Sequence, residues 1–315
     1  MQHIKNQQKS TKISYFAKNY RLYLMLLPVI AYLIIFSYYP MSGLIISFKD
    51  WRINGGIWGS PWATSDGSLD LFKHFKVLFN DPMFIQKFLN TIRISTLKLL
   101  IGFPVPIIIT ILLNEMSSLK LSKTFQVVSY LPYFISWVII SGILINMTSA
   151  GSAFQGVMTS FFGKELYFFT DNNLFLSMVV MSDIWKGAGW ATIIYFAAIT
   201  NIGSELYEAA DIDGASRFQK IIYITLPGML PAISIMLILQ VSGLIYGGFD
   251  QIFNMYNRTV FEKGDILETY LFRIGINDGQ YDVATAVGLF NSLIAFVLII
   301  FANKIIKKVG GEGIW

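Results

Sequence analysis

Few side chains in this sequence can perform covalent or metal chemistry. Its 315 residues include no cysteine and two histidines, His3 and His74, which excludes a cysteine nucleophile, a disulfide framework and a multi-histidine metal centre. No G-x-x-x-x-G-K-[ST] phosphate loop occurs, since Gly163-Lys164 is followed by Glu165, and no G-x-S-x-G nucleophile elbow is present. We therefore predict that the chain is not an enzyme and holds neither a metal nor a cofactor.

Acidic and small residues gather in one polar segment, residues 200–228, which reads TNIGSELYEAADIDGASRFQKIIYITLPG. We expect a short helix capped by Ser204, a left-handed break at Gly214 and a second helix limited by Pro227. Small side chains let another backbone approach closely, so the pattern favours a helix that docks into a groove of a partner. A solvated loop between two membrane spans is the alternative. The small residues are Ala209, Ala210, Gly214 and Ala215.

The composition predicts a membrane protein, because 54% of the residues are hydrophobic and 14% are charged, whereas soluble domains carry about 25% charged residues. A membrane-spanning helix needs about 20 mostly apolar residues. The first apolar stretch is too long for a cleaved signal peptide and should remain as a helix. We predict an all-α polytopic membrane protein with about six transmembrane helices, at residues 22–48, 88–114, 125–147, 174–199, 229–249 and 283–303.

Basic residues predict the orientation of the chain. The N-terminal tail carries five cations and no acid beside the first span, at Lys5, Lys9, Lys12, Lys18 and Arg21. By the positive-inside rule, both termini are then cytoplasmic, and the loops 49–87, 148–173 and 250–282 are outside. The net charge of +5 then reflects membrane topology. No basic stripe is present, so we expect no nucleic-acid partner.

The segment 200–228 carries a recognisable motif. Glu208-Ala209-Ala210 is followed by Gly214 four residues later, by Ile224 ten residues after that glycine, and by Leu226-Pro227. This resembles the EAA loop of ABC importer permeases, and every signature position matches. The flanking stretches DIWKGAGWATIIYFAAITNI and YDVATAVGLFNSLIAFVLI are similar to sugar-importer permeases of the maltose type. The N-terminal YLMLLPVIAYLIIFSYYP resembles the subgroup that transports oligosaccharides or polysaccharide fragments.

The resemblance implies a type I ABC importer permease fold and a set of partners. These are a second permease in a heterodimer, two ATPase subunits that bind ATP and Mg, an extracytoplasmic solute-binding protein, a carbohydrate and membrane lipid. It also implies a multi-pass protein of the bacterial cytoplasmic membrane. The expected regions are a cytoplasmic tail 1–21, a first helix with its outside loop 22–87, a core 88–306 that includes the coupling loop 200–228, and a C-terminal tail 307–315.

The resemblance also assigns roles within the coupling loop. Glu208 would pair with a cation of an ATPase subunit, and Asp213 would support the turn. The small residues would allow a close fit in the ATPase groove. The residues that would anchor the loop to the membrane core are Ile224, Leu226 and Pro227.

Sugars are bound by aromatic faces and by planar polar groups, and polar groups inside membrane spans are costly enough to suggest function. The substrate-path candidates are therefore Trp185, Trp190, Gln240, Tyr246 and Asn291, for which helix packing is the alternative. We expect Asp183 and Lys186, three residues apart on one helix, to form an ion pair or lie near water. Arg93 and Lys98 should snorkel or lie at the interface, and His74 should lie on the surface.

The sequence as a whole predicts the permease subunit of an ATP-driven ABC importer that moves a carbohydrate, most naturally an oligosaccharide, into the cytoplasm. Two alternatives belong to other classes. A secondary transporter driven by an ion gradient is favoured by Asp183 alone. A membrane-embedded enzyme would need convergent catalytic residues at one membrane depth, and the sequence offers one acid and no histidine at midspan.

Overall fold

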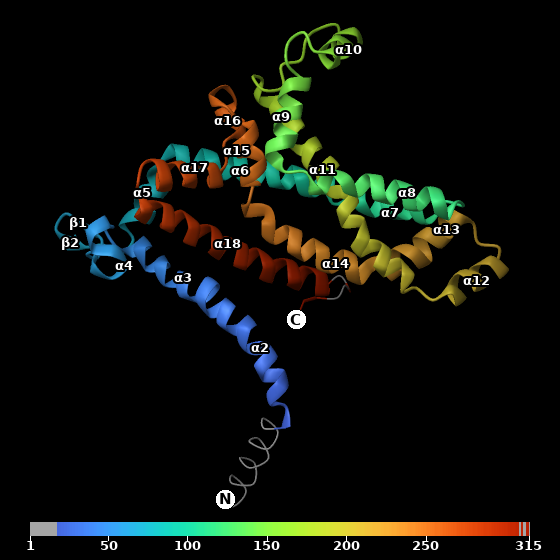
Figure 1. Ribbon diagram of the computed structural model, residues 1–315, viewed down its shortest axis with the longest axis horizontal. Helices are drawn as coiled ribbons and strands as arrows, with labels where there is room; N and C mark the ends of the chain where they lie inside the picture. The colour runs from blue at the N-terminus through green and yellow to red at the C-terminus, as the bar shows by residue number, and fades with distance from the viewer. Residues whose placement is uncertain (1–17, 309, 311–312, 315) are drawn as a thin grey trace, which may run out of the picture. The chain divides into compact units, whose positions relative to one another are not determined.

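The computed structural model describes residues 18–308, 310 and 313–314. The chain divides into two compact units, Met1–His74 and Phe75–Trp315, which are treated separately below (Figure 1). The tail cations Lys5, Lys9 and Lys12, and His3, lie outside the described residues. The regions expected from the sequence, the two cytoplasmic tails, the first helix with its outside loop and the core, are defined by membrane topology and stay predictions.

The first unit begins with a continuous apolar helical stretch, Tyr20–Phe48. The apolar helix α2 has no buried residue, as expected where lipid rather than protein surrounds a helix. A π-helical turn precedes Pro40, whose nitrogen cannot donate a helical hydrogen bond. The stretch consists of α2 (Tyr20–Leu33), η1 (Ile34–Tyr38), α3 (Tyr39–Met41) and η2 (Ser42–Phe48).

A short loop domain follows this helix within the first unit. It contains η3 (Ile53–Gly55), α4 (Gly56–Gly59) and the antiparallel pair β1 (Thr64–Ser65) and β2 (Ser68–Leu69). Asp66 and Gly67 connect the strands with φ angles of 51° and 79°. Two consecutive positive φ angles define the type I′ turn that suits a two-residue hairpin.

His74 is buried, which contradicts the expectation of a surface position. The residue is 4% exposed, and Nε2 lies 3.0 Å from the carbonyl oxygen of Lys49. This polar contact to the backbone makes the buried position of His74 favourable.

The neighbouring Asp50 carboxylate is held by hydrogen bonds, and Lys73 Nζ donates to its Oδ1 at 2.7 Å. Burial raises the pKa of the Asp50 carboxyl, but hydrogen bonds from Lys73 and Thr64 outweigh burial and hold the pKa below its usual value.

The second unit is built from helices. In Figure 1, α9 and α10 project away from the other helices of this unit, and α12 and α13 lie at a different end. The elements are α5 (Lys73–Asn80), which enters from the first unit, α6 (Pro82–Gly102), α7 (Pro104–Asn114), α8 (Leu119–Tyr130), η4 (Leu131–Phe134), α9 (Trp137–Met147), α10 (Ala153–Phe162), α11 (Asn172–Thr200), α12 (Ser204–Ile212), α13 (Arg217–Lys220), η5 (Ile221–Thr225), α14 (Leu226–Ser242), η6 (Gly243–Ile245), α15 (Phe249–Met255), η7 (Arg258–Val260), α16 (Phe261–Gly264), α17 (Leu267–Phe272), η8 (Arg273–Asn277) and α18 (Tyr281–Lys308).

Four helical stretches in the described part of the chain are long and apolar enough to cross a membrane: Tyr20–Phe48, Pro82–Asn114, Arg217–Ile245 and Tyr281–Lys308. They coincide with four of the six predicted spans. The fourth predicted span, 174–199, forms the 29-residue helix α11, about 43 Å long at 1.5 Å per residue. α11 is not one of the four, because charged residues, glycines and tryptophans lower its mean hydropathy.

The predicted span 125–147 is not a straight helix. Leu119–Phe134 and Trp137–Met147 meet at an angle of 97°. Pro132 lies in the short 3-10 helix that ends the first arm, and Ile135 and Ser136 have extended backbone. Ser136 then caps α9 by accepting a hydrogen bond from the Ile139 amide. By length and composition, the bent pair adds a fifth candidate span if its two arms cross as one.

α11 is the central helix of the second unit. Its buried residues belong to a cluster with α6 and α15 around Phe175 and Val179, and to another with α7 and α14 around Tyr195. Gly189 permits the close approach of α8, because a β-carbon at this position would clash with the carbonyl oxygen of Ser129. Small residues of this kind let membrane helices pack closely.

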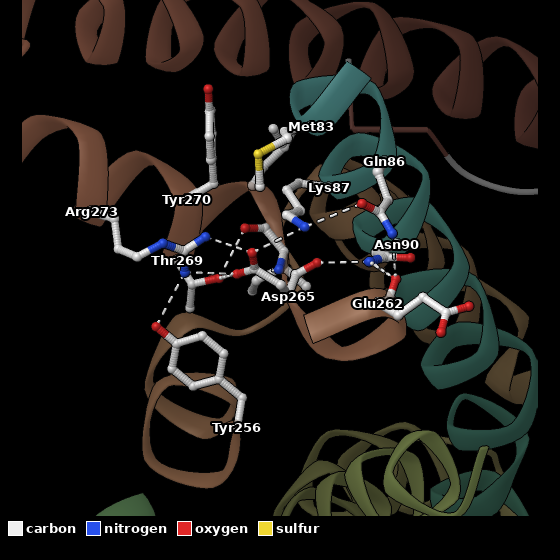
Figure 2. Close-up of polar contacts among 12 residues, drawn as sticks. Met83, Gln86, Lys87, Asn90, Tyr256, Glu262, Asp265, Thr269, Tyr270 and Arg273 are labelled. Atoms are coloured by element: carbon white, nitrogen blue, oxygen red, sulfur yellow. Dashed lines mark hydrogen bonds and ion pairs between the residues drawn. The ribbon is translucent and has the colours of Figure 1, made fainter. Parts of the chain in front are cut away.

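A buried carboxylate fixes α6 against α17 (Figure 2). The Asp265 side chain is fully buried and lies between Lys87 Nζ, 3.3 Å from Oδ2, and Arg273, whose Nη1 donates to Oδ1 at 3.0 Å. Thr269 Oγ1 also donates to Oδ1, at 2.7 Å. Two cations thus share one carboxylate, and its removal leaves both of them uncompensated.

We expect Asp265→Asn to destabilise the protein by about 3 kcal/mol, the cost of breaking a buried ion pair from one side. The measurement is the thermal unfolding midpoint of the detergent-purified chain. Asp278→Asn is the matched control, since this carboxylate is exposed on the segment that follows and should cost less than about 0.5 kcal/mol. Equal midpoints for the two variants would contradict the assigned role of Asp265.

Candidate functional site

The predicted helix–break–helix in the segment 200–228 is confirmed. α12 ends at Ile212 and Gly214 has a φ of 73°. The Gly214 amide donates to the carbonyl of Asp211 at 3.2 Å, and the Ala215 amide donates to that of Ala210 at 2.9 Å. These two bonds form a Schellman motif, which requires the left-handed conformation that glycine adopts without strain.

The capping of this loop differs from the prediction. Gly203 occupies the N-cap of α12 and no side chain caps it. Ser204 is already the first helical residue, because the extended conformation falls one residue earlier. The capping side chain of the loop is Ser216, which forms a capping box with Gln219 at the start of α13.

Two contacts that the sequence reading missed hold the loop together. Lys220 Nζ lies 2.7 Å from Asp211 Oδ1 and joins α13 to α12 across the glycine break. The Tyr207 hydroxyl lies 3.0 Å from Thr225 Oγ1 and joins α12 to η5. The sequence did contain a signal for the first contact, because the acid Asp211 and the base Lys220 stand on opposite sides of Gly214.

The loop presents a mixed surface. Glu208, Ala209, Asp213 and Gly214 are exposed, and Ala210 and Ala215 are half-buried. The apolar side chains Leu206, Ile212 and Phe218 are 56%, 88% and 71% exposed. An exposed apolar surface around a carboxylate and small residues is suited to contact with another protein.

The loop continues directly into the membrane helix. Ile224 and Leu226 are half-buried and Pro227 is exposed, within the continuous helical stretch Arg217–Ile245. A β-carbon on Gly228 would clash with the Ile202 side chain, so this glycine lets α14 pack against the turn that precedes α12.

A cavity of about 290 Å³ lies among α6, α11 and α14. Two of the predicted substrate-path residues, Gln240 and Tyr246, line it, together with Ser95, Lys98 and Asp183. These polar groups are distributed over all three helices. The size of the cavity is close to the lower end of the range for small-molecule sites.

Lys98 is the centre of the polar contacts around this cavity. Its Nζ donates to the Gly247 carbonyl at 3.0 Å and to Gln251 Oε1 at 2.5 Å, and it lies 3.1 Å from Asp183 Oδ1. The membrane depth of Lys98 stays a prediction. The expected pairing of Asp183 with Lys186 is wrong, because Lys186 Nζ instead donates to the carbonyls of residues 132, 133 and 135.

These contacts fix a break in the helical path, which we call the 246–248 break. Tyr246 is extended and Gly248 has a φ of 96°. Ser95 Oγ donates to the Tyr246 carbonyl at 2.9 Å, next to the bond from Lys98. On the opposite side, Glu268 Oε2 accepts from the Gly248 amide at 3.0 Å. The unpaired backbone groups of the break thus find partners on two other helices.

The remaining substrate-path candidates lie elsewhere. Trp185 is 54% exposed and borders a separate apolar pocket beside α9. Trp190 stacks on Tyr133 with ring centroids 4.6 Å apart. Asn291 on α18 is 3% exposed and lines a second pocket that also contains Tyr246. The five candidates therefore do not form one site, and their role in substrate binding stays a prediction.

Comparison with known proteins gives the class. Residues 102–310 match the family described as binding-protein-dependent transport system inner membrane component, and the chain belongs to this family. It is thus a multi-pass protein of the cytoplasmic membrane and the permease component of an ABC importer that works with a binding protein. The ATPase activity resides in a partner subunit. Family membership rejects the secondary transporter and the membrane-embedded enzyme.

Particular relatives are similar over nearly the whole chain. The polygalacturonan/rhamnogalacturonan transport system permease protein YteP of Bacillus subtilis (strain 168) is 37% identical over 99% of this chain and 95% of its own length. Protein LplB of the same organism is 38% identical over 93% and 91%. A crystal structure of a bacterial ABC transporter that imports the acidic polysaccharide alginate matches with a TM-score of 0.85 and 37% identity, over 95% of this chain and 99% of that one.

We expect Lys98→Met to lower stability by about 2 kcal/mol, because Gln251 Oε1 and the Gly247 carbonyl lose their donor. Adding Asp183→Asn should restore part of the lost stability, because it replaces the carboxylate that lost its cation with an uncharged amide. The thermal unfolding midpoint of the purified chain measures both effects. Arg93→Met is the control, an exposed cation on the same helix. A double variant no more stable than Lys98→Met would contradict the direct pairing of Lys98 and Asp183.

Proposed function

We propose that this chain is one of two permease subunits, in a heterodimer, of an importer that carries an acidic oligosaccharide into the cytoplasm. Two partner ATPase subunits bind ATP and Mg and drive transport, and a solute-binding protein delivers the sugar from outside. Both termini of this chain are cytoplasmic. The N-terminal cations and the positive-inside rule support this orientation.

The observation that carries the substrate class is Lys98 in the cavity wall. Its partner Asp183 is 39% exposed, so a carboxylate that enters the cavity can reach the ammonium and exchange with Asp183. Lys98 keeps its other two bonds, to Gly247 and Gln251, during such an exchange. The names of the relatives support an acidic substrate, because the solved transporter imports the acidic polysaccharide alginate and YteP is named for polygalacturonan and rhamnogalacturonan.

The coupling loop supplies the connection to ATP. Glu208 pairs with a cation of the ATPase subunit, while Ala209, Ala210, Gly214 and Ala215 let α12 enter a groove. The Schellman turn supported by Asp213 fixes the direction in which α12 projects. Small side chains and an exposed carboxylate support this contact.

Motion of the loop reaches the cavity through one helix. Arg217–Ile245 is continuous, is anchored near Ile224, Leu226 and Pro227, and ends at the 246–248 break beside Lys98. When the ATPases close, a displacement of α12 moves this stretch as a rigid body. The cavity then opens alternately to the two sides of the membrane.

We expect Glu208→Lys to reduce ATP-driven uptake of a labelled oligogalacturonate at least tenfold, because the carboxylate that pairs with the ATPase becomes a cation. The measurement is uptake into proteoliposomes that contain the complete complex. Glu115→Lys is the matched control, with the same charge change on the same predicted side but outside the coupling loop, and should retain uptake.

Two further measurements separate the coupling role from the substrate class. Co-purification of the ATPase subunits should fall with Glu208→Lys, while the unfolding midpoint of the permease stays unchanged. An unlabelled neutral glucan oligomer should not compete with the oligogalacturonate. Full uptake by Glu208→Lys would reject the coupling role, and equal competition by the neutral oligomer would reject the acidic substrate class.

A further inference from the structure

The loop domain of the first unit exposes apolar side chains close to the end of the first helical stretch. Ile53 is 82% exposed and Trp58 is 72% exposed. Both belong to a run of residues without charge between Arg52 and Asp66. We call residues 53–62 of this run the 53–62 segment. Exposed apolar groups on an uncharged segment favour contact with lipid or protein over contact with water.

Hydrogen bonds inside the loop hold the backbone of this segment. Lys49 Nζ donates to the carbonyls of Ile57 and Trp58 at 2.8 and 3.0 Å, and Lys49 itself is buried. Ser60 Oγ accepts a hydrogen bond from the Arg52 amide at 3.0 Å. These backbone groups have their partners inside the loop, which lowers the cost of moving the segment out of water.

The helical stretch Tyr20–Phe48 brings this segment to the boundary of the membrane. Its 29 residues are about 43 Å long at the rise of an α-helix, close to the thickness of roughly 40–45 Å for a bilayer with its headgroups. Lys18 and Arg21 are exposed near its start and suit one headgroup layer. We therefore expect Phe48 to lie in the other headgroup layer. The Ala63 amide donates to the Phe48 carbonyl at 3.0 Å, so the loop returns to this end of the helix.

We propose that the 53–62 segment is a membrane-interface anchor, which inserts Ile53 and Trp58 into the phospholipid leaflet at the end of the first helical stretch. An indole ring suits this layer because its body is apolar while its N–H group stays near water. Arg52 is exposed beside the segment and can bind a lipid phosphate. The proposal is independent of the substrate class and of the coupling loop.

Lipid fits this surface better than a protein partner does. The segment continues from a helical stretch whose helix α2 has no buried residue, so the lipid-facing surface extends into the loop. The area offered is also small. One Trp side chain covers at most about 250 Å², whereas a standard protein interface buries about 800 Å² on each partner.

The first experiment uses the absence of cysteine from this chain. Gly59→Cys places a single thiol beside Trp58, where a β-carbon has open space. The thiol is labelled with the fluorophore NBD on the purified chain before the complete complex is assembled in vesicles of phosphatidylcholine and phosphatidylglycerol. Ser68→Cys, exposed on the neighbouring hairpin, is the matched control. We expect phosphatidylcholine with a nitroxide near the headgroup end of its acyl chain to quench the label at position 59 at least threefold more strongly than the label at position 68.

The second experiment tests the contribution of the indole ring in the labelled Gly59→Cys chain. Trp58→Ser should lower the quenching by nitroxide lipid at least twofold, because the ring that holds the segment in the leaflet is removed, and Trp58→Phe should keep most of it. Equal quenching at positions 59 and 68, or quenching that Trp58→Ser leaves unchanged, would overturn the proposal. Quenching at position 59 that disappears when the solute-binding protein is added would assign the segment to a protein contact and would also overturn it.

Discussion

The arrangement of the second unit depends on one partly buried ammonium group. Lys98 on α6 binds the carbonyl of Gly247, the amide oxygen of Gln251 and the carboxylate of Asp183. Gln251 in turn donates to Val179 and Ser182 of α11. Because a charge largely withdrawn from water must be paired and hydrogen-bonded, these contacts hold α6, α11 and α15 together beside the cavity and keep the backbone open at the 246–248 break.

The 246–248 break, which Lys98 holds open, lies at the end of the helix that follows the coupling loop. The loop is rigid in itself, through the Schellman turn at Gly214, the ion pair between Asp211 and Lys220, and the contact of Tyr207 with Thr225. The helical stretch that follows α12 runs through a π-helical turn and past Pro231 to the break. We expect a displacement at α12 to be transmitted along this stretch to the backbone whose carbonyls Lys98 and Ser95 hold.

Local sequence signals predicted the local features well. The position of Gly214 and the apolar stretches were sufficient for the loop and for most spans, because turn chemistry and hydropathy act within a few residues. The bend of 97° after Pro132, the inward position of Lys98, the pairing of Asp183 and the burial of His74 depend on partners distant in sequence. Polar and aromatic side chains inside the predicted spans correctly indicated Gln240 and Tyr246, which line the cavity. The same criterion also indicated Trp185 and Trp190, which lie elsewhere.

The most direct test of the central claim is the energy source of uptake. Proteoliposomes that contain the complete complex and binding protein are loaded with ATP and Mg or, alternatively, energised only by a proton or sodium gradient, and uptake of labelled oligogalacturonate is measured. We expect uptake with ATP alone and none with the gradient alone. Uptake that persists without ATP under an ion gradient would contradict it.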